Sequence, residues 1–427
     1  MSKVVVMFPG QASQYVGMGK SLYEGNESVR QRFQEASEVL GYDLGDLCFN
    51  GPAQKLTQTE HTQPAILVLS VGMFEVAREE GLQPHFLAGH SLGELSALTA
   101  AGVLKFTDAV KLSSIRGKAM AASSAGIKAG MSAVTKIEAD RIEPVIVQLQ
   151  EEGHAIQIAN YNAPTQTVLS GSTEGLRIAS ERLSAIGAKV IPLNVSGPFH
   201  SSFMAGAVDT MATALESIKL GEMAIPVMNG LEGRLYTKDD DIKSALVTQL
   251  TGPVRWTTVL KRLYEEGAEL WLEMGPKDIL KKLTLQTLPD VKVYAYDEEG
   301  DRENIRKELD EIIQKKKQIP NLLGLCLGAA VCTRNTNWNE DAYQKGVVEP
   351  YKEIQSLYEM SEKEGYVSEN QMKRALVLLR QIFTTKGTPK EEQLSRFTNI
   401  LKLTDTDRLF SEFMVLEGEA ADVNSDF

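Results

Sequence analysis

Residues 89–93, Gly89-His90-Ser91-Leu92-Gly93, fit the pattern G-x-S-x-G. They stand where an apolar approach, residues 84–88, meets a helix that we expect to begin near Glu94. In such a strand-to-helix turn, flanking glycines permit the sharp bend that presents a serine hydroxyl. Ser91 is therefore the first candidate nucleophile. Because the same pentapeptide also suits an ordinary turn before a helix, the rest of the chain must decide between the two.

Up to about residue 297, short β-rich runs alternate with longer amphipathic stretches. This pattern is typical of an α/β domain with a mostly parallel sheet, here a hydrolase-like core with Ser91 after a strand. The runs that we expect to form strands are 4–8, 86–88, 190–193, 225–228 and 270–273.

Between about residues 126 and 195 the pattern changes. Three further strand-like runs are separated by two helical runs, which gives the order β-α-β-β-α-β once residues 190–193 are added. This order is typical of a small ferredoxin-like unit, so we expect an inserted subdomain between Ser91 and His200. The strand-like runs are 131–134, 156–159 and 167–170, and the helical runs are 138–152 and 173–186.

Residues 298–427 have almost no strand signal and are expected to form a linker and a helical C-terminal extension. A charged stretch, 298–317, comes first, and the acidic end, 417–426, is expected to be solvated. The sequence leaves two roles open for the extension: docking to a carrier or synthase, or covering apolar surface on the catalytic domain. The helical runs are 322–332, 349–364, 369–384 and 390–402.

Composition excludes several classes of protein. The 427 residues are 43% hydrophobic and carry a formal charge of −12, which indicates a globular protein that does not bind nucleic acid. The 3 cysteines are too few and scattered for a disulfide framework or a metal site. The most apolar segment, 322–332, is shorter than the roughly 20 residues of a membrane span, and no leader precedes residues 4–8. We therefore expect a cytoplasmic protein without a membrane partner.

A serine hydroxyl needs a base to take its proton, and His200 is the strongest candidate. It lies in the turn-rich segment 196–201, directly after the strand predicted at 190–193, where an active-site loop is expected. His90 belongs to the turn of Ser91 and is expected to support it. The other histidines lie in polar or turn settings and look ordinary: His61, His85 and His154.

Acyl transfer also requires donors for the developing oxyanion, each worth roughly 3 kcal/mol. The backbone N–H of Leu92, the residue after the nucleophile, is one candidate. The side chain of Gln11 is the other, because Phe8-Pro9-Gly10-Gln11 ends a predicted strand at the carboxyl edge of the sheet, where ligands of α/β folds collect. Standing alone, Gly10-Gln11 would be read as a simple turn.

In their order along the chain, these motifs resemble the sequence motifs of malonyl-CoA:acyl carrier protein acyltransferases. The resemblance covers roughly residues 3–295, and nothing comparable supports the extension. The matching residues are Phe8-Pro9-Gly10-Gln11, Thr62-Gln63-Pro64-Ala65, Gly89-His90-Ser91-Leu92-Gly93-Glu94, Arg116-Gly117, Gly130-Met131, Asn160-Tyr161-Asn162-Ala163-Pro164, His200-Ser201, Asn229, Pro253-Val254-Arg255-Trp256 and Glu273-Met274-Gly275-Pro276.

The resemblance implies a ping-pong transfer without a resident cofactor. Ser91 attacks the thioester of malonyl-CoA, His200 acts as base and then as acid, and Gln11 with Leu92 N–H holds the oxyanion. A backbone carbonyl orients the histidine in this family, and the matching position is Gln249. The malonyl group then passes to the phosphopantetheine thiol of a holo acyl carrier protein.

The substrate class that the resemblance implies depends on Arg116. A guanidinium can hold the free carboxylate of a malonyl group through two parallel hydrogen bonds, whereas an uncharged acyl chain leaves it unpaired. By itself, Arg116 could also be a surface residue on a helix over 109–122. Phe199 resembles the aromatic residue that malonyl-selective members of the family carry at this position. One such pocket contact discriminates against methylmalonyl by ~1–3 kcal/mol. Further implied substrate-binding residues are Gln63, His90, Met131 and Asn160.

Two departures from the family pattern bear on context. Ala12 replaces a glycine often found after the Gly-Gln pair, and Gly197-Pro198-Phe199-His200 differs from the housekeeping pattern. Together with the extension, they resemble free-standing acyltransferases that load modular polyketide or hybrid polyketide-peptide synthases in trans. We expect a monomer.

Three alternatives stay open. One is an acyl hydrolase that clears carrier proteins, although such relatives generally lack an arginine at the position of Arg116. The second is a housekeeping malonyltransferase of fatty-acid synthesis. The third is a non-catalytic docking subunit, which an intact set of Ser91, His200 and Gln11 disfavours.

Overall fold

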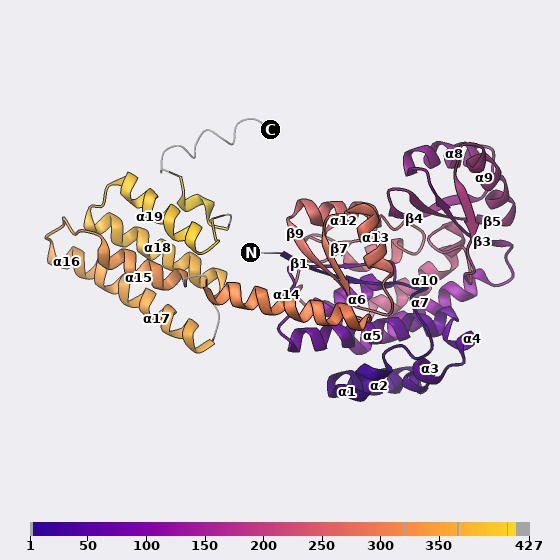
Figure 1. Ribbon diagram of the computed structural model, residues 1–427, viewed down its shortest axis with the longest axis horizontal. Coiled ribbons are helices and arrows are strands. Elements are labelled where there is room, and N and C mark those ends of the chain that lie inside the picture. The colour runs from indigo at the N-terminus through magenta and orange to yellow at the C-terminus, as the bar shows by residue number, and fades with distance from the viewer. Residues whose placement is uncertain (1–2, 319–320, 365–366, 408, 416–427) are drawn as a thin grey trace. The chain divides into compact units, whose positions relative to one another are not determined.

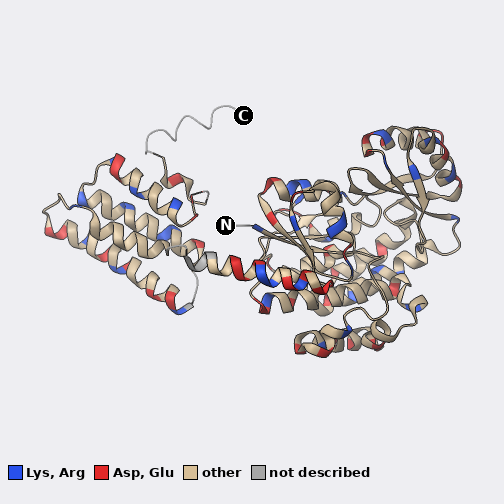
Figure 2. Ribbon diagram, viewed as in Figure 1, with Lys and Arg blue, Asp and Glu red and all other residues tan. Residues whose placement is uncertain are grey.

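The computed structural model describes residues 3–318, 321–364, 367–407 and 409–415 (Figure 1). The chain divides into two compact units, one up to Leu309 and the other from Asp310 onward. The division falls within helix α14 (Glu299–Gln318), on which Figure 2 shows charged residues of both signs.

The first unit is built on a parallel four-stranded sheet with the order β10-β9-β1-β2. Both faces are covered, which explains the apolar run of β1: Val5 and Met7 belong to a core shared with helices α12 and α13, whereas the Phe8 ring meets Phe74 of α5 at 5.9 Å. The strands are β1 (Lys3–Phe8), β2 (Phe86–Gly89), β9 (Ala268–Glu273) and β10 (Lys292–Ala295), and the helices are α5 (Thr59–Glu79), α12 (Trp256–Glu265) and α13 (Ile279–Thr287).

One predicted strand needs correction, and two strands were missed. Residues 190–193 correspond to β6 (Lys189–Pro192), which pairs with β3 (Ala129–Thr135) and supplies the fourth strand of the predicted inserted subdomain. Of residues 225–228, only Met228 lies in a strand, the two-residue β7 (Met228–Asn229), although Val227 forms an isolated bridge to Leu87. Pro226 lacks the N–H that a longer ladder needs. The missed strands are both short: β10 lies at the edge of the main sheet, and β8 (Arg234–Leu235) pairs with β7.

The inserted subdomain contains an antiparallel sheet with the order β4-β5-β3-β6. Two helices pack against it, and together they enclose a separate apolar core that includes Val134, Ile142 and Leu183. The order of the strands and helices along the chain, together with the order of the strands in the sheet, corresponds to the ferredoxin-like arrangement. The elements are β3 (Ala129–Thr135), α8 (Ala139–Glu151), β4 (Ile156–Ala163), β5 (Gln166–Ser172), α9 (Thr173–Ala185) and β6.

The second unit is helical and has a core made of its own residues. Leu323, Leu379 and Phe383 are fully buried in this core. The ammonium of Lys386 donates to the carbonyls of Ala330 (2.6 Å) and Thr333 (3.0 Å), which satisfies the end of α15. The helices are α15 (Leu322–Cys332), α16 (Glu340–Tyr343), α17 (Glu349–Glu364), α18 (Glu369–Lys386) and α19 (Lys390–Leu403).

Two expectations from the sequence concern the rest of this unit. The apolar run 322–332 is helix α15, and none of the helices in the described ranges is both long and apolar enough to cross a membrane. The acidic end, 417–426, lies outside the described residues.

The core of the second unit predicts a local effect for Phe383→Ala. Phe383 is buried against Phe397, with ring centroids 5.5 Å apart, so the truncation should cost about 3–5 kcal/mol. Hydrogen exchange of the α18 and α19 amides should accelerate accordingly. Val377→Ala is the control on the same helix, because Val377 is 44% exposed. Unchanged protection in Phe383→Ala would show that this core does not hold the unit together.

Candidate active site

The nucleophile turn is held at the end of two paired strands. β2 ends at Gly89 and α6 (Gly93–Ala100) begins four residues later, which leaves Ser91 in a left-handed conformation with φ 54°. Phe8 pairs with Gly89 in the parallel register, and His90 N–H donates to the Phe8 carbonyl at 2.9 Å. A Cβ on Gly93 would lie 2.0 Å from that carbonyl oxygen, so the turn requires glycine.

Ser91 and His200 form a hydrogen-bonded pair. Ser91 Oγ lies 2.8 Å from His200 Nε2, and His200 Nδ1 lies 2.9 Å from the backbone carbonyl of Gln249. Because that carbonyl only accepts, Nδ1 carries the proton and Nε2 is left to accept from the serine. Burial, together with the nearby Arg116 guanidinium, lowers the pKa of His200 to about 3, so the imidazole is a neutral base.

The two expected oxyanion donors lie beside the serine. Leu92 N–H has no acceptor among the described residues, and Leu92 and Gln11 both line the cavity in front of Ser91. Gln11 Nε2 donates to Thr59 Oγ1 at 3.3 Å, a long contact that a better acceptor can replace. Ala12 has φ 86°, the left-handed region that favours glycine, so a glycine at this position, as the family pattern expects, would adopt the turn with less strain.

Arg116 is a buried residue on helix α7 (Phe106–Ser124) and not the surface residue that its helix alone would suggest. It is 3% exposed, and its two terminal nitrogens donate to Gln63 Oε1 (3.0 Å), Gln249 Oε1 (3.0 Å) and Ser91 Oγ (3.1 Å). Burial lowers its pKa to about 10, which leaves it charged at neutral pH. In the described parts of the chain, no carboxylate forms an ion pair with it. A buried, unpaired guanidinium next to the nucleophile is suited to a substrate carboxylate.

A cavity of about 210 Å³ lies in front of Ser91, between the main sheet and the inserted subdomain. Gln63 and Gln249 do not line it; both lie behind Arg116 and contact its guanidinium. Nine of the residues predicted from the sequence do line it: Gln11, His90, Ser91, Leu92, Arg116, Met131, Asn160, Phe199 and His200.

Sequence reasoning missed several supporting residues. Asn162, quoted only within a motif, holds His90 Nε2 at 2.9 Å. Glu94 is 2% exposed, and burial raises the pKa of its carboxyl to about 7. Its position three residues after Ser91 offered a signal for a role in the site, but its partner Tyr236 is distant in sequence. Within the described residues, no cluster of histidine, cysteine or acidic side chains is arranged to hold a metal ion.

Comparison with known proteins gives consistent matches. The acyl transferase domain family matches residues 5–305. A malonyl CoA-acyl carrier protein transacylase of Bacillus subtilis strain 168 is 40% identical over 296 residues, covering 69% of this chain and 93% of that protein. A second one from Bacillus subtilis is 33% identical over 400 residues, 92% of this chain and 99% of that protein.

Solved structures support the fold. A malonyl CoA-acyl carrier protein transacylase from Clostridium perfringens superposes with a TM-score of 0.71 at 33% identity, covering 74% of this chain and all (100%) of that one. A type II PKS acyl-carrier protein in complex with its malonyl-transacylase gives a TM-score of 0.69 at 36% identity, covering 72% of this chain and 100% of that one. The predicted α/β fold class is confirmed.

The geometry of the turn predicts that Gly89→Ala prevents the serine from being presented. A Cβ at Gly89 would lie 2.0 Å from the Gly93 carbonyl carbon, so the turn must open or the protein must unfold. We expect a lower melting temperature and loss of acylation at Ser91. Gly130→Ala, where a Cβ meets no atom within 4 Å, should change neither. An intact Gly89→Ala protein with normal acylation would contradict this description of the turn.

Proposed function

The chain belongs to the acyl transferase domain family, and we propose that it moves a malonyl group from malonyl-CoA, through an ester on Ser91, to the phosphopantetheine thiol of an acyl carrier protein. One observation carries the substrate class: the buried Arg116 guanidinium lies 3.1 Å from Ser91 Oγ and has no carboxylate partner in the described residues. The names of the relatives that match this chain support the same reaction.

In the first half-reaction, Ser91 Oγ attacks the thioester carbonyl while His200 Nε2 takes its proton. The resulting oxyanion is held by Leu92 N–H and by the Gln11 side-chain amide. When the intermediate collapses, the C–S bond breaks and His200 returns the proton to the departing CoA thiolate. The imidazolium is transient, and the Gln249 carbonyl at 2.9 Å stabilises its Nδ1–H.

In the second half-reaction, the carrier thiol gives its proton to His200 and attacks the ester of Ser91. The C–O bond of the ester breaks, and the serine oxygen takes the proton back. The phosphopantetheine belongs to the carrier partner, so the enzyme needs no resident cofactor for this chemistry.

Arg116 and Phe199 determine which acyl groups fit. In this proposal, the two terminal nitrogens of the Arg116 guanidinium, here called the Arg116 fork, hold the malonyl carboxylate through charge-assisted hydrogen bonds. The thioester carbon then reaches Ser91. Phe199 is buried beside His200 and lines the cavity, so its ring opposes a substituent on the α-carbon, as in methylmalonyl. The discrimination from such a contact is roughly 1–3 kcal/mol.

The hydrolase alternative differs only in the second acceptor, water in place of the carrier thiol. Arg116 argues against it, because an enzyme that clears varied acyl chains gains nothing from a buried cation at the acyl subsite. An intact dyad likewise argues against a non-catalytic docking subunit.

The finer proposal is that the enzyme loads a polyketide or hybrid polyketide-peptide synthase in trans, as a cytoplasmic monomer. Two observations support it over a housekeeping role in fatty-acid synthesis. One relative matches 92% of the chain, so the match takes in much of the extension, and one superposing structure is a transacylase bound to a type II PKS carrier. The self-contained core of the extension favours docking to a carrier or synthase as its role. A comparison of transfer rates to synthase carrier domains and to a fatty-acid carrier separates the two contexts.

Ser91→Ala should abolish the covalent intermediate. After brief exposure to malonyl-CoA, intact-protein mass spectrometry should find a malonyl adduct on the wild type and none on the variant, with turnover lower by about 10⁴-fold or more. Ser96→Ala, at a buried serine on α6, the helix that follows Ser91, is the control and should keep the adduct. An adduct that persists in Ser91→Ala would place the nucleophile elsewhere.

Arg116→Ala should change which substrate is accepted. Loss of charge-assisted bonds to the malonyl carboxylate should slow malonylation by about 10- to 100-fold, while acetylation from acetyl-CoA changes much less. Arg262→Ala, at a 52% exposed position on α12, is the matched control. Equal malonyl and acetyl rates in the wild type would rule out the proposed role of Arg116.

A further inference from the structure

A buried carboxylate lies behind the site. Glu94 accepts hydrogen bonds from Tyr236 Oη (2.5 Å), Gly230 N–H (3.2 Å) and Gln249 Nε2 (2.6 Å). It contacts neither Ser91 Oγ nor His200, and it does not line the cavity, so the reaction described above makes no use of it. Burying a carboxylate is costly, and three donors directed at one group indicate a specific role.

The Gln249 amide lies between Glu94 and Arg116. On one side are the Glu94 carboxyl oxygens, which accept the hydrogen bonds from Tyr236, Gly230 and Gln249; on the other is Arg116, which only donates them. A glutamine between two such groups has one satisfactory orientation, with Nε2 toward Glu94 and Oε1 toward Arg116 Nη2 at 3.0 Å. The backbone carbonyl of the same residue holds His200 Nδ1.

Without the carboxyl, Gln249 Nε2 would lose its shortest hydrogen bond and keep only the 3.3 Å bond to the Ser91 backbone carbonyl. Gly230 N–H would lose its acceptor and compete for Gln249 Oε1, and a rotation of the amide toward Gly230 would turn Nε2 toward Arg116. Two donor groups would then face each other, and the guanidinium would move away from its position 3.1 Å from Ser91 Oγ. A displaced guanidinium should slow substrates that carry a carboxylate more than substrates that do not, because only the former bind it through charge-assisted hydrogen bonds.

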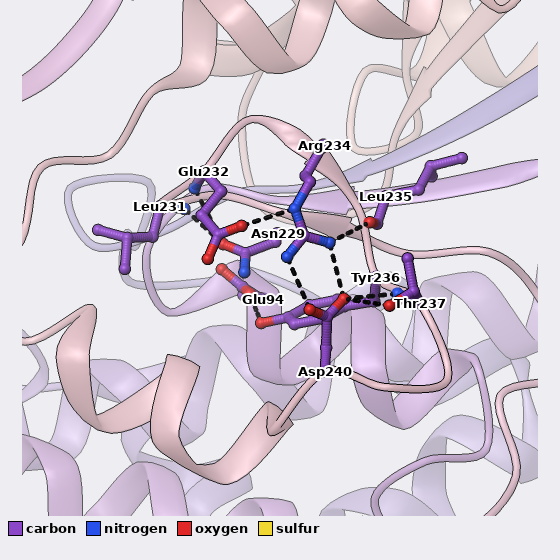
Figure 3. Close-up of polar contacts among 9 residues, drawn as sticks. All are labelled: Glu94, Asn229, Leu231, Glu232, Arg234, Leu235, Tyr236, Thr237 and Asp240. Atoms are coloured by element: carbon purple, nitrogen blue, oxygen red, sulfur yellow. Dashed lines mark hydrogen bonds and ion pairs between the residues drawn. The ribbon is translucent and has the colours of Figure 1, made fainter.

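The surroundings hold Glu94 itself in place. Tyr236 follows the hairpin of β7 and β8 (Arg234–Leu235), and Figure 3 shows its hydroxyl directed at Glu94. The hairpin is closed by Arg234, whose guanidinium pairs with Asp240 Oδ1 and Glu232 Oε2, each at 2.6 Å. Asn229 Oδ1 accepts from two backbone N–H groups within the turn. The carboxylate therefore has a fixed position from which to orient Gln249.

We propose that Glu94 is a positioning residue for substrate selectivity: it orients the Gln249 amide and thereby holds the Arg116 fork in place for the malonyl carboxylate. The proposal rests on the proposed malonyl transfer. It also explains why Glu94 contacts Arg116 only through Gln249. A carboxylate bound directly to the guanidinium would occupy the fork that the substrate needs.

The test measures single-turnover acylation of the full-length chain by malonyl-CoA and by acetyl-CoA, using intact-protein mass spectrometry, and compares the malonyl-to-acetyl rate ratio. Glu94→Met removes the acceptor, and the ratio should fall about tenfold. Glu94→Gln keeps an amide oxygen that can still accept from Gln249, so its ratio should stay within about twofold of the wild type. If Glu94→Met does not fold, Tyr236→Phe gives a milder test, with an expected fall of about threefold.

Two controls separate positioning from a general structural effect. Glu273→Met removes another fully buried carboxylate, which caps helix α13, and should lower the melting temperature without changing the ratio. In an Arg116→Ala background, Glu94→Met should not lower the ratio further, because the group through which it acts is gone.

Each other outcome is decisive. If the wild type forms no malonyl adduct, the proposed function itself is wrong. If the wild type is malonylated and both Glu94→Met and Tyr236→Phe keep its ratio, only the role of Glu94 is overturned. A ratio that falls equally in Glu94→Gln and Glu94→Met would also overturn it, because charge and not amide orientation would then set selectivity.

Discussion

The parallel pairing of β1 with β2 is the constraint on which the site depends. It sets Phe8 opposite Gly89, so that the turn after β1 and the nucleophile turn after β2 leave the sheet side by side. The glycines at the second turn let the backbone approach the Phe8 carbonyl more closely than any side chain would allow. Ser91 and Gln11 consequently line the same cavity, where the proposed reaction uses them as nucleophile and oxyanion donor.

The positive charge in the site has no direct counter-ion among the described residues until a substrate carboxylate binds. The histidine is oriented by a carbonyl and is neutral, whereas the arginine beside it is charged and surrounded by amides. Gln249 links the two, since its backbone serves His200 and its side chain serves Arg116. A buried cation without a direct counter-ion is unfavourable in the free enzyme, and an incoming malonyl carboxylate relieves that cost. This favours malonyl over an uncharged acyl group at the moment of acylation.

Much of this arrangement could be predicted from local sequence. Glycine spacing and apolar runs identify the turn of Ser91, the strands β1 and β2 and the β-α-β-β-α-β subdomain, because each depends on short-range steric preferences. The assignments of Arg116 and Gln249 required the family resemblance. What could not be predicted depends on residues far apart in the chain: the contact of Tyr236 with Glu94 joins positions 142 apart, and the isolated bridge of Val227 to Leu87 links segments on either side of the inserted subdomain. No local pattern specifies such contacts.

In the proposed reaction, the malonyl ester on Ser91 persists until the thiol of a carrier protein attacks it. The most direct measurement isolates the malonylated enzyme and mixes it with holo carrier protein, with apo carrier protein or with buffer, and follows the intact masses of both proteins over time. If transfer is correct, the enzyme loses its adduct rapidly only with the holo carrier, which gains the same mass. Equally rapid loss in all three mixtures, with free malonate appearing, would contradict transfer and establish a hydrolase.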